Sequence, residues 1–78
     1  MADLYCVIIN RVAEKVGSVD DVAHYIVSID DWLSEEKQRY RVVGINDAGQ
    51  TRVMTTTDQR KLSTSIACAK EEAQGGAR

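Results

Sequence analysis

The stretch SVDDVAHYIVSIDDWL, residues 18–33, carries the clearest periodic pattern in the chain and its only Trp. Its apolar residues recur at three- and four-residue steps and polar residues fall on the opposite side, which predicts an amphipathic helix. Ser18 can cap the start, because its hydroxyl can accept from the backbone N–H three residues on. Asp20 and Asp21 then place negative charge at the positive end of the helix dipole. We expect the rest of the chain to pack around this helix.

Residues 2–16 fit two patterns. The run LYCVIIN, residues 4–10, is rich in β-branched residues and apolar on both faces, as a central strand is. A helix ending at Val16 also places the apolar residues on one side, with only Val7 out of position. Because the pattern continues unbroken to Val16, beyond the length of most strands, the helix is favoured. Gly17 would end that helix and Ser18 would begin the next, giving an αα-hairpin.

Residues 39–56 predict a β-hairpin. The turn is Asn46-Asp47-Ala48-Gly49, with Asn at its first position and Gly where positive φ is needed. This loop sets four cross-strand pairs: Asn46 with Gln50, Ile45 with Thr51, Val43 with Val53, and Val42 with Met54. Neither face of the hairpin is cleanly polar, so either helices cover both faces or one face meets another molecule.

A third helix is expected over DQRKLSTSIACAKEEA, residues 58–73. Thr56 is its predicted N-cap and Gln59 holds the capping-box position. Its apolar stripe is narrow: Leu62, Ile66, Ala69 and Ala73. Residues 75–78 are expected to form a frayed tail. The chain is therefore predicted to be one small α+β domain over residues 1–78, ordered ααββα, with βαββα as the alternative.

The amino-acid composition is typical of a soluble chain with a small core. Of its 78 residues, 44% are hydrophobic and 28% charged, and none is Phe. The longest apolar run, residues 4–9, is far shorter than the roughly 20 residues of a membrane span, and no basic region precedes it as in a secretory signal. We expect a cytoplasmic protein without a membrane segment. Because so small a domain buries little surface, any apolar face left over is a candidate interface.

Charge is divided unequally along the chain. Residues 1–36 carry eight acidic and two basic side chains, whereas residues 37–78 carry eight basic and four acidic ones. The acidic pairs near the central helix offer a surface for a basic partner. The opposite sign gathers beside Tyr40, in Arg39, Arg41, Arg52, Arg60 and Lys61. A basic hairpin next to a helix is a plausible nucleic-acid surface, with Arg41 and Arg52 contacting phosphates first.

No catalytic, metal or cofactor motif stands out. Cys6 and Cys68 lack a CxxC spacing and are read as reduced small residues, and His24 is expected on the exposed helix face. Ser28 follows Val27 in mid-helix, whereas acyl carrier proteins modify a Ser that directly follows an Asp at a helix start. We therefore expect no enzyme, no metal site and no cofactor.

The segment YRVVGINDAGQTRVMTTTDQ, residues 40–59, resembles small phage head–tail joining proteins over those residues alone, and no residue roles are carried over from it. The two-sided apolar hairpin, the sparse core and the divided charge favour a non-enzymatic protein-binding module. We expect a homodimer or a larger assembly, or an inhibitor or adaptor of the phage or mobile-element type. The alternatives are nucleic-acid binding through the basic hairpin, or a structural role in an assembly. Candidate partner-binding residues are Asp30, Asp31, Glu35, Tyr40, Arg41, Arg52 and Met54.

Overall fold

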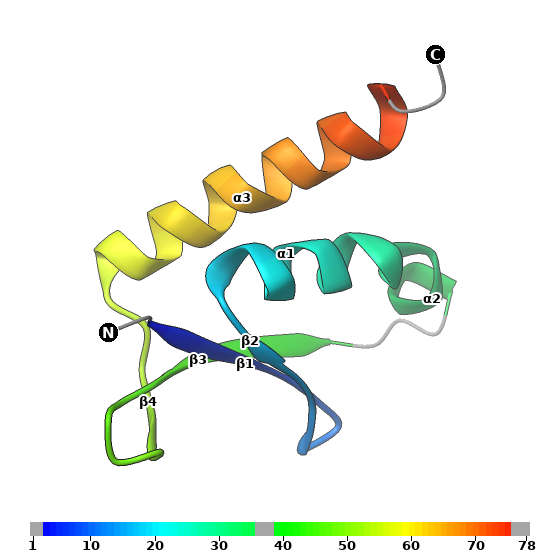
Figure 1. Cartoon of the computed structure of the whole chain (residues 1–78). Coiled ribbons are helices and arrows are strands. Elements are labelled where there is room, and N and C mark those ends of the chain that lie inside the picture. The colour runs from blue at the N-terminus through cyan, green and yellow to red at the C-terminus, as the bar shows by residue number, and fades with distance from the viewer. Residues whose placement is uncertain (1–2, 36–38, 76–78) are drawn as a thin grey trace.

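The computed structural model describes residues 3–35 and 39–75. Within them the chain has the expected α+β class, with four strands and three helices. In chain order these are β1 (Leu4–Ile9), β2 (Val12–Gly17), α1 (Val19–Ser28), α2 (Asp30–Glu35), β3 (Tyr40–Ile45), β4 (Thr51–Arg52) and α3 (Thr56–Gly75). The strands form one antiparallel sheet in the order β2-β1-β3-β4, and the helices lie on one side of it (Figure 1).

The N-terminal segment is a β-hairpin, so the predicted first helix and the order ααββα are wrong. The alternative βαββα has β1 right but misses β2. Asn10 and Arg11 link the two strands with φ values of 51° and 67°. Two consecutive left-handed residues are the pattern of a type I′ turn, whose twist matches that of paired strands. Asn favours such a turn but Arg does not, so the sequence gives only a weak turn signal.

Strand β1 lies inside the sheet, where it pairs with β2 along one of its sides and with β3 along the other. Its residues Tyr5, Val7 and Ile9 are 1%, 0% and 2% exposed and belong to the core under the helices. We call this side of the sheet the inner face and the opposite side the outer face. Alternation places Cys6 on the outer face, where it is nevertheless buried because Val16 and Val43 lie next to it on the neighbouring strands.

Helix α1 covers the inner face, and its predicted start is confirmed. The Ser18 hydroxyl accepts from the Asp21 N–H at 3.2 Å, and the Asp21 carboxylate accepts from the Ser18 N–H at 3.1 Å. The predicted single helix is divided at Ile29, however, and continues as the short α2. Trp32 of α2 is 44% exposed, so it does not belong to the buried stripe as predicted.

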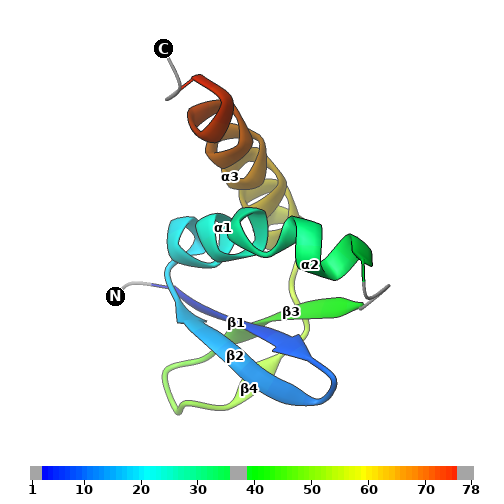
Figure 2. The same cartoon turned by 90° about the vertical axis from the view of Figure 1, so that its right-hand side faces the viewer.

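Helix α3 begins beside the end of β4 and then crosses α1 (Figure 2), so that it packs mainly on α1 rather than on the sheet. It runs from Thr56 to Gly75, whereas we expected a helix over residues 58–73 and Gly75 in the tail. Thr55 is the residue before the helix, and Thr55 and Asp58 exchange side-chain hydrogen bonds of 3.1 Å with each other's backbone N–H. The capping box therefore uses Asp58 instead of Gln59. Leu62 and Ala69 are buried and Ile66 partly so.

The second hairpin has the predicted turn. Gly49 has a φ of 80° and donates to the Asn46 carbonyl at 2.9 Å, and the Asn46 side chain accepts from the N–H groups of Ala48 and Gln50. Ile45 pairs with Thr51 as predicted. The ladder ends after the next pair, so the predicted pairs of Val43 with Val53 and of Val42 with Met54 are absent from it. None of the helices in the described residues is long and apolar enough to cross a membrane.

Candidate protein-binding groove

A groove of about 500 Å³ lies where β4 stops pairing with β3. It is lined by residues 40–43 of β3, by residues 51–54, and by Gln59 and Leu62 of α3. The chain leaves β3 after Arg52 because Met54 turns inward and joins the core, where it is 9% exposed. We call the part of this groove beside β3, in the place where a longer β4 would lie, the slot.

The edge of β3 in this slot carries backbone groups without a partner among the described residues. Asn46 donates its N–H to Gln50 across the hairpin, and Gly44 pairs with Arg52. Because backbone groups alternate between the two edges of a strand, Val42 and Tyr40 direct their N–H and C=O groups to the same edge. Beyond Arg52, however, the described chain adds no further pair to this ladder. Such an edge is a template for pairing with another strand.

Apolar side chains flank this edge on both faces of the sheet. On the inner face Val42, Met54 and Leu62 belong to or pack against the core. On the outer face Val43 lines the groove. Val53 lines it too, and at 87% exposed it is the most exposed of the large apolar side chains described. A groove with backbone groups along its floor and apolar walls fits an extended peptide better than a small polar molecule.

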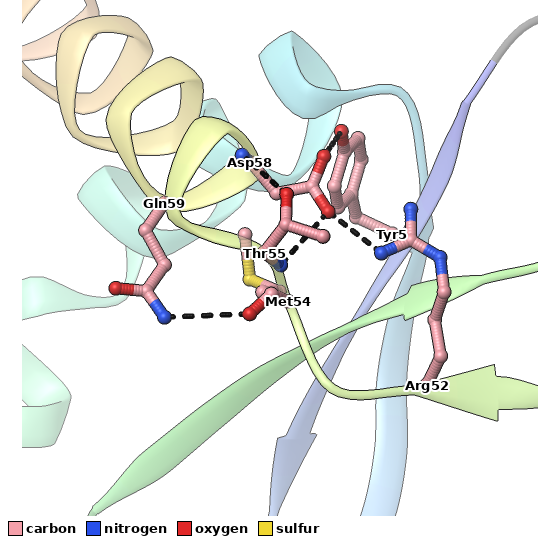
Figure 3. Close-up of polar contacts among 6 residues, drawn as sticks. All are labelled: Tyr5, Arg52, Met54, Thr55, Asp58 and Gln59. Atoms are coloured by element: carbon pink, nitrogen blue, oxygen red, sulfur yellow. Dashed lines mark hydrogen bonds and ion pairs between the residues drawn. The ribbon is translucent and has the colours of Figure 1, made fainter.

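One carboxylate fixes the wall of the groove (Figure 3). Asp58, 6% exposed, accepts from the Tyr5 hydroxyl at 3.0 Å, from the Arg52 Nη1 at 2.6 Å and from the Thr55 N–H at 3.1 Å. It therefore joins the first turn of α3 to β1 and β4. Arg52 reaches it by lying across Gly44, where an added Cβ would lie 2.5 Å from the guanidinium carbon. Gly44 thus leaves the space that this arrangement needs.

The same contacts shift the pKa values of the three groups. The Arg52 guanidinium, helped by the backbone and side chain of Thr55 and by Tyr5, holds the pKa of Asp58 well below its usual range. Burial, followed by the hydrogen bond to Asp58, raises the pKa of the Tyr5 hydroxyl. The hydrogen bond to Asp58 raises the pKa of Arg52. All three groups keep their ordinary charge at neutral pH, so the cluster acts as a structural clamp.

A second hollow, of about 520 Å³, adjoins the groove at the start of β3. It is lined by Ile8, Asn10, Arg11, Arg39, Tyr40 and Arg41. Arg11 comes from the turn after β1, and it meets Arg39 and Arg41 because Ile9 pairs with Tyr40 across the sheet. Within the described residues the ion pairs are those of Arg52 and His24, so these three arginines have no acidic partner there.

Four of the residues predicted to bind a partner meet at this groove: Tyr40, Arg41, Arg52 and Met54. Asp30 does not join them, because it begins α2 and lines a shallow hollow with Lys70 of α3. Asp31 and Glu35 belong to α2, but their side chains lie outside the described part of the structure. Sequence reasoning missed Leu62 as a lining residue, and it did not group Arg11 with the basic surface. Recognising the two-residue turn at Asn10 could have placed Arg11.

No cluster of three or more His, Cys, Asp or Glu within residues 3–35 and 39–75 could hold a metal ion. His24 is exposed, as predicted, and its Nε2 lies 2.9 Å from the carboxylate of Glu72, which raises the pKa of His24. Cys6 and Cys68 are both free thiols, the first buried and the second exposed.

The fold and groove define a small α+β domain with a four-stranded antiparallel sheet covered by helices on one face. Comparison with known proteins finds no matching family model, no matching curated protein and no matching solved structure.

Proposed function

We propose that this protein is a non-enzymatic protein-binding module, and that an extended segment of its partner binds in the groove beside β3. The observation that carries the proposal is the open edge of residues 40–43 between apolar walls. A strand added there would hydrogen-bond to Val42 and Tyr40 and place alternate side chains on the two faces of the sheet. In this role the chain acts as an adaptor or inhibitor.

The expected contributions to the binding free energy correspond to a moderate affinity for the partner segment. Each backbone hydrogen bond that replaces a bond to water contributes about 0.5–1.5 kcal/mol. Covering apolar surface adds about 25 cal/mol for each Å² removed from water. Val53 and the apolar walls of the groove supply such surface without any rearrangement of the core. Strand addition therefore requires ordering of the partner segment and little change in this chain.

Selection from a library of short random peptides displayed on phage tests the proposed function. Wild-type protein should enrich peptides whose binding is lost in Val42→Pro, which removes one outward N–H. The ladder to β1 should survive, since Val42 directs its backbone groups to the open edge and edge strands tolerate proline. As a control, circular dichroism and thermal melting should show that Val42→Pro is folded.

A second pair of variants distinguishes peptide binding in the groove from nonspecific binding to exposed apolar side chains. Val53→Asp should abolish peptide binding, whereas Val12→Asp should leave it intact. Val12 is also exposed, at 55%, but it lies on β2 at the other edge of the sheet. Failure to enrich any peptide, or equal loss of binding in both variants, would overturn the proposed function.

Nucleic-acid binding is the second candidate, and the three arginines of the second hollow favour it. Phosphate contacts would make affinity fall steeply with salt and in Arg41→Ala. Arg52, which the sequence also suggested for this role, is already paired with Asp58. Titration with fluorescent single- and double-stranded oligonucleotides at low and high salt distinguishes the two candidates.

A further inference from the structure

We infer, on the basis of the proposed groove function, that the partner segment alternates apolar and acidic side chains. Its apolar residues lie over the inner face and its acidic residues over the outer face, beside Arg41, Arg11 and Arg39. The sides follow from the pleat, because successive residues of a strand point to opposite faces. Val42 packs against the core on the inner face, so Arg41 and Val43 belong to the outer face.

The inner side of the slot selects apolar residues. A side chain entering there meets Val42, Met54 and Leu62, which all line the groove and contact or belong to the core. Gln59 is the polar residue that α3 contributes to the lining, and its amide donates to the Met54 carbonyl at 3.5 Å. Arg52 also lines the groove on this side, but its charge is already paired with Asp58. A carboxylate here would therefore lose its hydration without finding an unpaired opposite charge.

The outer side selects acidic residues. Arg41 lines both the groove and the second hollow, where Arg11 and Arg39 join it. Ile8 pairs with Arg41 across the sheet, so the base of this basic hollow is apolar. Carboxylates of an added strand would therefore find three guanidinium groups without acidic partners in the described chain.

The same arginines argue against a second copy of the chain in this slot. A two-fold antiparallel pairing that uses Val42 and Tyr40 of both copies sets Arg41 directly opposite the same arginine of the other copy. Like charges placed directly opposite each other destabilise paired strands, and charged residues commonly protect sheet edges from self-association. Charge complementarity therefore favours a different chain with acidic side chains.

Four peptides fused to the same soluble carrier test the inference by fluorescence anisotropy. They are an alternating Glu-Val repeat, a Thr-Val repeat, a Lys-Val repeat, and a peptide with the composition of the first but its Glu and Val residues in separate blocks. Glu-Val should bind about tenfold more tightly than Thr-Val, the effect of a few partly exposed ion pairs. Lys-Val and the block peptide should bind more weakly still.

Charge reversal supplies the matched variants. Arg41→Glu should weaken the Glu-Val peptide and strengthen the Lys-Val peptide. Lys70→Glu makes the same charge change on the distant half of α3 and should change neither, since Lys70 lines a different hollow. Such an exchange of preference is not expected from a variant that merely loses stability.

The outcomes distinguish the inferred acidic preference from the proposed peptide-binding function on which it rests. Equal binding of Glu-Val and Thr-Val, lost in Val53→Asp, would overturn the acidic preference and leave the groove function intact. If no peptide binds and the display selection is also empty, both are overturned. Binding of an oligonucleotide that requires Arg41, without binding of Glu-Val, would overturn the inference in favour of nucleic acid.

Discussion

Asp58 is the residue on which the geometry of the groove depends. Its carboxylate receives hydrogen bonds from Tyr5 and Arg52, which lie far apart in the sequence, and it also caps the helix that forms one wall. Its charge offsets that of Arg52, whose side chain is one-third exposed. Loss of this carboxylate should loosen the start of α3 and the exit of β4 together.

We expect Asp58→Asn to lower the free energy of unfolding by about 2–3 kcal/mol, because Arg52 loses its partner and the capping hydrogen bonds weaken. Urea denaturation followed by circular dichroism measures the change. Asp47→Asn is the control, since Asp47 is exposed in the hairpin turn. Equal stability of the two variants would contradict the role assigned to Asp58.

The pH dependence of stability should reveal the same residue. The pKa of Asp58 is lowered from its ordinary 3.8 in the folded chain, so the unfolded chain binds a proton first as the pH falls. The stabilisation is therefore complete above about pH 4 and is lost as the pH falls toward the folded pKa. Asp58→Asn should flatten this part of the curve of unfolding free energy against pH.

At the scale of elements, α3 packs mainly on α1. Leu62 and Ala69 are its buried apolar residues, and the Ser65 hydroxyl donates to the Asp20 carboxylate at 3.0 Å. Leu62→Ala should lower the free energy of unfolding by about 2–4 kcal/mol, as for other buried Leu residues. Ile66→Ala, at a partly buried site, should have a smaller effect in the same urea titration.

The contact between His24 and Glu72 should make the docking of α3 on α1 depend on pH. The hydrogen bond to Glu72 raises the pKa of His24 above 6.5, so its stabilisation is present below that pH and is lost as the pH rises through the folded value. Glu72→Gln should bring the pKa of His24, measured by NMR titration, back toward 6.5. An unchanged titration would show that the contact does not form in solution.

At the scale of the whole molecule, the outer face of the sheet has no helix over it in the described chain (Figure 1). Leu4 on β1 and Val16 on β2 are 41% and 51% exposed there. An apolar face of this kind promotes association, and it is separate from the slot beside β3. It is the surface on which we expect copies of the chain to meet.

Sedimentation should therefore detect weak self-association at high protein concentration. Val16→Lys, which puts a charge on the outer face, should abolish it. Val12→Lys is the matched control, because Val12 pairs with the inner-face residue Ile9 and lies off this surface. A wild-type chain that stays monomeric at every concentration would contradict the assembly expected from the sequence.

Local patterns were sufficient for part of this fold. The cap at Ser18, the turn ending at Gly49 and the existence of α3 depend on residues within a few positions of one another, so the sequence alone predicts them. Tyr40, Arg41, Arg52 and Met54 were chosen from the hairpin pattern, and the structure brings them to one groove.

Only the tertiary structure decided the rest. Residues 4–16 satisfy both the helical and the strand period, and pairing with β3 selects the hairpin because it buries β1 between two neighbours. Asp58 meets Tyr5 across 53 residues of chain, so no local pattern could predict the clamp. The open slot exists because Met54 turns into the core and ends the ladder of β4, a result of packing between distant elements.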